Sequence, residues 1–171
     1  MDISDIKELP KRKHPRMKDF DYSLCGAYFI TICTQNRRCL LSRIVGRGLA
    51  PAEEAGLELT SFGEIAKQQL FLLKKRYPFL DVDQYVIMPN HIHLLISLES
   101  DSKITVGRFV GALKSITANR WRKLEDGTGM EKLWQRDYYD HIIRNEKDYL
   151  EKLQYIDCNP DKWKDDELWR S

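Results

Sequence analysis

The spacing of hydrophobic and polar side chains along the chain predicts two kinds of element. Residues 28–34 (YFITICT) and 82–98 (VDQYVIMPNHIHLLISL) are rich in β-branched and aromatic side chains, which is typical of strands. Pro89 and Asn90 interrupt the second run with residues that favour a turn. The sequence therefore predicts one strand at 28–34 and a hairpin of two strands within 82–98.

Apolar side chains recur every three to four residues in other segments, which indicates helices. The first helix covers 61–76, with Ser61 and Glu64 at capping-box spacing. Its predicted core residues are Ile65, Leu70, Leu72 and Leu73. A second helix is predicted at 104–123. A third covers 145–159, where the following proline disfavours helical geometry.

The remaining segments complete an α+β order. Cys39–Val45 is predicted to pair with the first strand, and Leu133–His141 to be a last strand. Gly46–Leu59 contains three glycines and a proline, which predict a loop. The order strand, strand, helix, hairpin, helix, strand, helix indicates an α+β sandwich with an antiparallel sheet. We expect a single domain at 21–171 after an N-terminal arm at 1–20.

The composition fits one globular domain and excludes several classes of protein. The chain has 171 residues, of which 42% are hydrophobic and 32% are charged, enough to bury a core. No apolar run reaches the roughly 18–20 residues of a membrane helix, and the N-terminus lacks the apolar stretch of a secretory signal. We therefore expect a cytoplasmic protein without a membrane partner. Its four cysteines, none in a C-x-x-C pair, are expected to be reduced thiols.

The net charge of +2 conceals two basic stretches that contain no acidic residue. One is the N-terminal stretch Lys11, Arg12, Lys13, Arg16 and Lys18. The other runs from 103 to 123 and includes Lys114. Stretches of this kind suit a polyanion such as nucleic acid, although a solvated surface produces the same pattern.

His91 and His93 form an H-x-H motif on the second strand of the predicted hairpin. Side chains alternate along a strand, so both imidazoles point to one face while Ile92 and Leu94 point to the other. Two imidazoles on one face can chelate a divalent cation, and unpartnered imidazoles are costly to bury. The motif favours a metal site slightly over a pair of hydrogen-bonded histidines at a sheet edge.

The helix predicted at 145–159 carries a second candidate pair. At about 100° per residue, its apolar side chains Tyr149, Leu150, Leu153 and Ile156 gather on one side. Tyr155 and Asn159 lie on the opposite side, four residues apart. A phenol beside an amide oxygen suits a nucleophile beside a metal ligand. By spacing alone, an exposed tyrosine and an asparagine that satisfies backbone carbonyls explain the pattern better.

The segment 134–141 is a third candidate. It places aromatic side chains beside Arg136, which suits stacking on bases and pairing with phosphates. It also offers the alternative nucleophiles Tyr138 and Tyr139 and an alternative metal ligand, His141. An edge strand with core aromatics gives the same pattern.

These motifs resemble a known family. The run MPNHIHLLI at 88–96 resembles the HUH signature of the single-tyrosine transposases of insertion sequences. The block from LWQR to DHIIRNE at 133–146, followed by Tyr155 and then Asn159 before a proline, is similar to the REP-associated tyrosine transposases of that family. The first strand and the second helix contribute further similar segments, and the resemblance covers about 11–163.

The resemblance implies a ferredoxin-like, RRM-like sandwich that cuts and rejoins single-stranded DNA at palindromic or hairpin elements. It implies that His91, His93 and Asn159 bind Mg²⁺ or Mn²⁺. It also implies that Tyr155 is the nucleophile, giving a 5′-phosphotyrosine and a free 3′-OH. The residues expected to hold the DNA are Lys11, Arg12, Lys13, Arg16, Arg37, Arg38, Lys114, Trp134 and Arg136. The expected location is the cytoplasm, with the protein associated with the nucleoid, and both a monomer and a homodimer are compatible with the resemblance.

Two other interpretations fit the sequence less well. A catalytically silent protein of the same fold that binds hairpin DNA or RNA would not need both histidines, a tyrosine and a nearby amide. A metal-dependent hydrolase of small phosphoesters, with Asp140 or His141 as third ligand, would leave the basic stretches unexplained. Attachment of the protein to cleaved single-stranded DNA would distinguish the three.

Overall fold

A four-stranded antiparallel sheet forms the centre of the protein. The computed structural model describes residues 25–45, 56–99, 104–124, 132–166 and 168. The strands are β1 (Gly26–Cys33), β4 (Leu80–Ile87), β5 (His91–Leu98) and β6 (Tyr139–Ile142), in the order β4-β5-β1-β6. β5 therefore lies between two neighbours and presents both of its faces to the interior.

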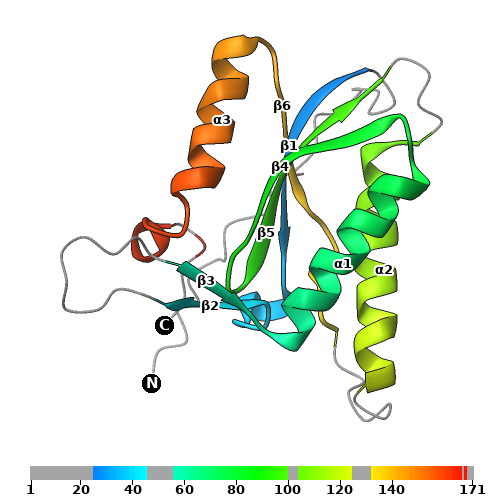
Figure 1. Ribbon diagram of the computed structural model, residues 1–171, viewed down its shortest axis with the longest axis vertical. Helices are drawn as coiled ribbons and strands as arrows, with labels where there is room; N and C mark the ends of the chain where they lie inside the picture. Colours follow the sequence, from blue (N-terminus) through cyan, green and yellow to red (C-terminus); the bar gives the residue numbers. More distant parts are fainter. Residues whose placement is uncertain (1–24, 46–55, 100–103, 125–131, 167, 169–171) are drawn as a thin grey trace, which may run out of the picture.

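Helices cover both faces of this sheet. α1 (Ser61–Arg76) and α2 (Val106–Leu124) lie on one face, and α3 (Glu146–Cys158) lies on the other (Figure 1). In chain order the central elements read β1, α1, β4, β5, α2, β6, which is the split β-α-β arrangement of a ferredoxin-like sandwich. The predicted α+β fold class is confirmed.

The two faces of the sheet have separate hydrophobic cores. The larger core joins even-numbered residues of β5, Ile92, Leu94 and Ile96, to α1 and α2. The smaller core joins Leu95 of β5 to Ile156 of α3. Each fully buried aliphatic side chain contributes about 1.5–3 kcal/mol, so the larger core supplies most of the hydrophobic stabilisation.

The first helix begins differently from its prediction. Thr60, not Ser61, is the N-cap, and its side chain accepts a hydrogen bond from Gly63 N at 3.1 Å. The predicted capping box is therefore wrong, because the threonine one residue earlier already has extended backbone angles and accepts that bond. The prediction that Leu72 is a core residue is also wrong. Leu72 is 50% exposed, because the buried face of α1 runs through Leu70 and Leu73.

The predictions for residues 39–45 and 46–59 are corrected. β2 (Ser42–Val45) pairs with β3 (Gly56–Leu59) in a separate two-stranded sheet, and not with β1. Both edges of β1 are already paired, with β5 and β6. The predicted loop at 46–59 therefore ends in a strand, while residues 46–55 lie outside the described part of the chain.

The last strand is shorter than predicted. β6 covers only the end of the predicted 133–141 segment, and Trp134 instead forms an isolated bridge with Thr34. Asn145 caps α3, as predicted, by accepting from Asp148 N at 2.9 Å. Leu150 is exposed and not part of the α3 core. No helix among the described residues is long and apolar enough to cross a membrane.

Candidate active site

His91 and His93 are buried side by side on the face of β5 that α3 covers. The two residues are 0% and 2% exposed, and their ring centroids lie 4.4 Å apart. Ile92 and Leu94 point into the opposite core, so the alternation predicted for the H-x-H motif is confirmed.

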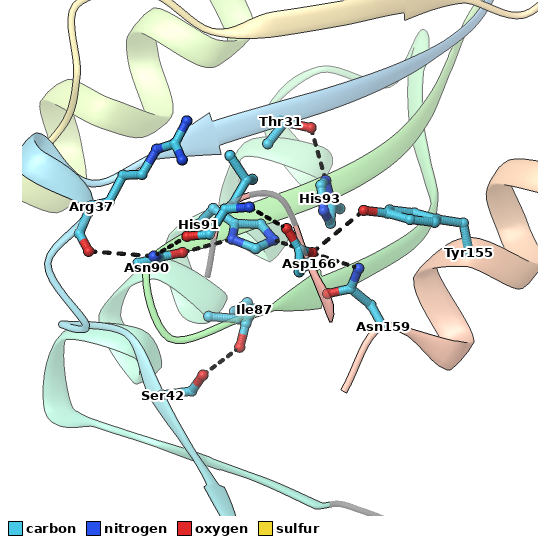
Figure 2. Close-up of polar contacts among 11 residues, drawn as sticks. Thr31, Arg37, Ser42, Ile87, Asn90, His91, His93, Tyr155, Asn159 and Asp166 are labelled. Atoms are coloured by element: carbon cyan, nitrogen blue, oxygen red, sulfur yellow. Dashed lines mark hydrogen bonds and ion pairs between the residues drawn. The ribbon is translucent and has the colours of Figure 1, made fainter. Parts of the chain in front are cut away.

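Asn90 fixes the orientation of His91. The amide Nδ2 of Asn90 donates to the backbone carbonyls of Arg37, at 3.3 Å, and Leu168, at 2.8 Å. Its Oδ1 therefore faces His91 Nδ1, 2.8 Å away, and accepts the proton of that nitrogen (Figure 2). His91 Nε2 keeps its lone pair, which is the form of imidazole that binds metal.

Thr31 of β1 orients His93 in the way that Asn90 orients His91. Its Oγ1 lies 2.8 Å from His93 Nδ1 (Figure 2), and the ring of Phe29 stacks on the imidazole at 5.0 Å between centroids. Burial, together with the positive charge of Arg37, lowers the pKa of His91 to about 3. Burial and the neighbouring His91 lower the pKa of His93 well below its usual value. Both imidazoles are therefore neutral at physiological pH.

Asn159 brings a third ligand-type atom to the same place. It lies at the C-cap of α3, is 3% exposed, and its Nδ2 donates to Asp166 Oδ2 at 3.3 Å. Within the described part of the chain, Asn159 Oδ1 has no hydrogen-bond partner, and neither has Nε2 of His91 or His93. Buried polar atoms without partners are rare and call for an explanation, and these three belong to the three residues predicted as metal ligands.

Tyr155 lies at the edge of this group. Its ring centroid is 5.3 Å from that of His93, and it remains 44% exposed. Its hydroxyl donates a long hydrogen bond of 3.4 Å to Asp166 Oδ2 (Figure 2). A hollow of about 440 Å³ opens here, lined by Tyr155, His93, Arg37 and Lys152 among others. The phenol is thus accessible to a substrate beside the buried imidazoles.

Asp166 and Lys152 line the site and were missed by sequence reasoning, as were the orienting residues Thr31 and Asn90. The side chain of Asp166 is 3% exposed, and its Oδ2 lies 3.9 Å from His91 Nε2. It follows α3 in a run of acidic residues without periodicity, so nothing in the sequence singled it out. Lys152 offered a usable signal, because it lies three residues before Tyr155 and therefore on the same side of α3.

The alternative residues have other positions. Tyr138 is 3% exposed and belongs to the larger core, whereas Tyr139 lines the same hollow as Tyr155. His141 Nε2 lies 2.8 Å from a carboxylate oxygen of Asp148, so this histidine is engaged away from the pair on β5. Tyr139 is therefore the alternative nucleophile that shares a hollow with His93.

The residues predicted to contact DNA fall into several groups. Arg37 and Arg136 line a second hollow of about 770 Å³, and Arg38 is half-buried next to Arg37. Lys114 lines it too, but its Nζ donates to the backbone carbonyls of Gln135, at 3.0 Å, and Asp137, at 2.8 Å. Lys114 therefore holds the 135–137 segment in place. The basic residues of the arm, at 11–16, lie outside the described part of the chain.

Trp134 packs in the hydrophobic core, a role that was not predicted alongside base stacking. It is 7% exposed, its Nε1 donates to Thr117 Oγ1 at 2.9 Å, and its ring packs on Phe62 at 5.4 Å. The structure therefore places this side chain in the core beneath the second hollow.

Comparison with known proteins finds one family model and several relatives. Residues 66–159 match the family model described as "Transposase IS200 like". An uncharacterized protein of Haemophilus influenzae is 31% identical over 92% of this chain and 93% of its own length. The REP-associated tyrosine transposase of Escherichia coli is 26% identical over 80% of this chain and 67% of its own. The solved structure of a REP-associated tyrosine transposase bound to a REP hairpin has a TM-score of 0.63 and 21% identity, over 86% of this chain and 73% of that one. The chain therefore belongs to the IS200-like transposase family, among the REP-associated tyrosine transposases.

Proposed function

We propose that this transposase cleaves and rejoins single-stranded DNA through attack of Tyr155 on a phosphodiester next to a hairpin. The observation that carries the proposal is a group of three buried atoms, His91 Nε2, His93 Nε2 and Asn159 Oδ1, that have no hydrogen-bond partner among the described residues and belong to residues beside an exposed phenol. The solved relative bound to a REP hairpin supports hairpin DNA as the partner.

In the proposed step, Tyr155 Oη loses its proton and forms a bond to phosphorus as the bond from phosphorus to the 3′ oxygen of the preceding nucleotide breaks, and that 3′ oxygen gains a proton. The products are a 5′-phosphotyrosine on the downstream strand and a free 3′-OH on the upstream strand. The covalent intermediate keeps the energy of the phosphodiester available for rejoining. The exposure of Tyr155 and the accessible hollow around it support this role.

The donor set fits a divalent cation. Two neutral imidazoles and an amide oxygen are ligands for Mn²⁺, and for Mg²⁺ where oxygen ligands complete the site. A bound ion would act as a Lewis acid on the scissile phosphate. Asn90 and Thr31 hold both imidazoles with Nε2 directed into the site, so the chain has preorganised the ligands.

Basic side chains extend from this site along the surface. Arg37 and Lys152 line the hollow around Tyr155, where they would bind the phosphate oxygens. Arg37 also lines the larger hollow together with Arg122, Lys132 and Arg136. A single strand held in the larger hollow would therefore lead to Tyr155, with the basic arm at 11–18 as a further contact.

The test uses hairpin oligonucleotides with randomised single-stranded flanks and a different label at each end, incubated with Mn²⁺. Attack by Tyr155 predicts that the 3′ label moves with the protein on a denaturing gel, while the 5′ label stays on a free fragment. Tyr155→Phe is expected to abolish the adduct, and Tyr139→Phe, in the same hollow, to retain it. An adduct with Tyr155→Phe would make the assignment wrong, and hairpin binding without cleavage by the wild type would favour the silent binding protein.

A further inference from the structure

Asp166 reaches the candidate site from outside the elements that carry the H-x-H motif and the tyrosine. It follows the short 3-10 helix η2 (Trp163–Asp165), and its side chain is 3% exposed. Figure 2 shows its carboxylate between His91, Tyr155 and Asn159. A carboxylate at this depth needs a physical explanation, because acidic side chains are almost never fully buried unless they are paired.

The hydrogen bonds of Asp166 only partly offset its burial. Its Oδ1 accepts from Leu168 N at 2.6 Å, and its Oδ2 accepts two long bonds, from Tyr155 Oη at 3.4 Å and from Asn159 Nδ2 at 3.3 Å. Arg37 and Lys152 line the same hollow, but across the described ranges neither forms a salt bridge with Asp166, and the contact of Asp166 Oδ2 with His91 Nε2 is a long 3.9 Å. A buried carboxylate without a direct salt-bridge partner of opposite charge favours binding of a cation.

The positions of the ligand atoms suit a single ion. One ligand atom from each of His91, His93 and Asp166 lies within 4.8 Å of the others. Around an ion with bonds of about 2.1 Å, adjacent ligand atoms are roughly 3.0 Å apart and opposite ones roughly 4.2 Å apart, so the three atoms would have to move closer together by up to about 2 Å to bind one ion. The two imidazole Nε2 atoms have no hydrogen-bond partner among the described residues.

We propose that Asp166 is itself a ligand of the divalent cation between His91 and His93. The inference rests on the proposed function and adds the negative charge that two imidazoles and an amide cannot provide. Carboxylate oxygen is a preferred ligand of Mg²⁺ and Mn²⁺, so Asp166 would raise affinity for these ions in particular. Metal binding would then depend on the segment that follows α3 as well as on β5.

Calorimetric titration of the full chain with Mn²⁺, without DNA, tests this ligand. Asp166→Asn is expected to weaken Mn²⁺ binding by about tenfold or more, because it removes the charge and leaves the size. The matched control is Asp157→Asn, which removes the same charge from an exposed side chain of α3 that is hydrogen-bonded to Gln84 at 2.9 Å. The Mn²⁺ affinity of Asp157→Asn should stay within about twofold of the wild-type affinity. His93→Ala provides the reference for loss of the site.

The outcomes separate this inference from the proposed function. If Asp166→Asn binds Mn²⁺ like the wild type while His93→Ala does not, Asp166 is not a ligand and the histidine site stands. If the wild type binds no Mn²⁺, the metal site of the proposed function is itself wrong. Faster cleavage by Asp166→Asn at unchanged Mn²⁺ affinity would mean that the carboxylate only obstructs the site, which also overturns the inference.

A second variant covers the case in which Asp166→Asn does not fold. Asp166→Glu keeps the charge but moves the carboxylate by one methylene, so the electron paramagnetic resonance spectrum of bound Mn²⁺ should change. An unchanged spectrum and an unchanged affinity in Asp166→Glu would contradict direct coordination.

Discussion

Replacing Thr31 by valine removes the group that orients His93 without changing the shape of the side chain. Thr31 Oγ1 lies 2.8 Å from His93 Nδ1 in a buried contact. His93 Nε2 must keep its lone pair to bind a cation, so the imidazole proton belongs on Nδ1, where threonine accepts it. In Thr31→Val this N–H would face a methyl group.

The expected loss of metal affinity follows from that contact. A buried N–H left without an acceptor costs about 1–3 kcal/mol. The metal-free protein can avoid part of this cost by moving the proton to Nε2, because Asp166 places a carboxylate in the same cluster of ligand-type residues. The metal-bound protein cannot move this proton, because the metal occupies Nε2. The cost of the unsatisfied N–H therefore mainly weakens metal binding. We expect Thr31→Val to weaken Mn²⁺ binding by roughly 10–100-fold, the range typical for partners of metal-ligating histidines.

Calorimetric titration with Mn²⁺ measures this loss, with Thr117→Val as the control. Thr117 is also fully buried, and its Oγ1 accepts from Trp134 Nε1 at 2.9 Å, in the core on the opposite side of the sheet. Without metal, Thr117→Val should lose about 1–3 kcal/mol of unfolding free energy in urea, and Thr31→Val should lose less, because its imidazole proton can move to Nε2. Only Thr31→Val should lose metal affinity. Wild-type affinity in Thr31→Val, or an equal loss in Thr117→Val, would refute the reasoning.

Two further predictions test the packing around the site. A Cβ at Gly63 would collide with the backbone carbonyl of Leu41, so Gly63→Ala should destabilise the protein by about 1–3 kcal/mol. Gly111 in α2 has open space, so Gly111→Ala should stabilise by about 0.5–1 kcal/mol; equal urea midpoints for the two variants would contradict the packing. Burial raises the pKa of the Cys33 thiol to about 11, so iodoacetamide at mildly alkaline pH should label exposed Cys25 much faster than Cys33. Equal labelling rates would mean that β1 is not packed as described.

The sequence predicted those parts of the site that depend on local periodicity. The two-residue repeat of a strand placed His91 and His93 on one face, and the structure confirms it. The helical repeat likewise separated Tyr155 and Asn159 from Ile156, which packs in the smaller core. These relations hold because backbone geometry within one element determines them, whatever packs around it.

Features that depend on contacts distant in sequence were not predicted. Asp166 reaches the site because Trp163 packs near His91, with ring centroids 5.8 Å apart, and Leu168 O accepts from Asn90. Neither contact leaves a periodic pattern in the sequence that could predict it. Leu72 failed for a related reason: consecutive apolar residues in α1 do not reveal which face meets the sheet until α2 is in place.

In the proposed mechanism, Tyr155 forms the covalent bond to DNA beside a metal site on β5. Mass spectrometry of the peptide that carries the nucleotide, after cleavage of a hairpin oligonucleotide in Mn²⁺, tests it most directly. We predict that the nucleotide is attached through its 5′ phosphate to Tyr155, and that His91→Ala yields no such peptide. Attachment to Tyr139, the other phenol of the same hollow, or an undiminished yield from His91→Ala, would contradict it.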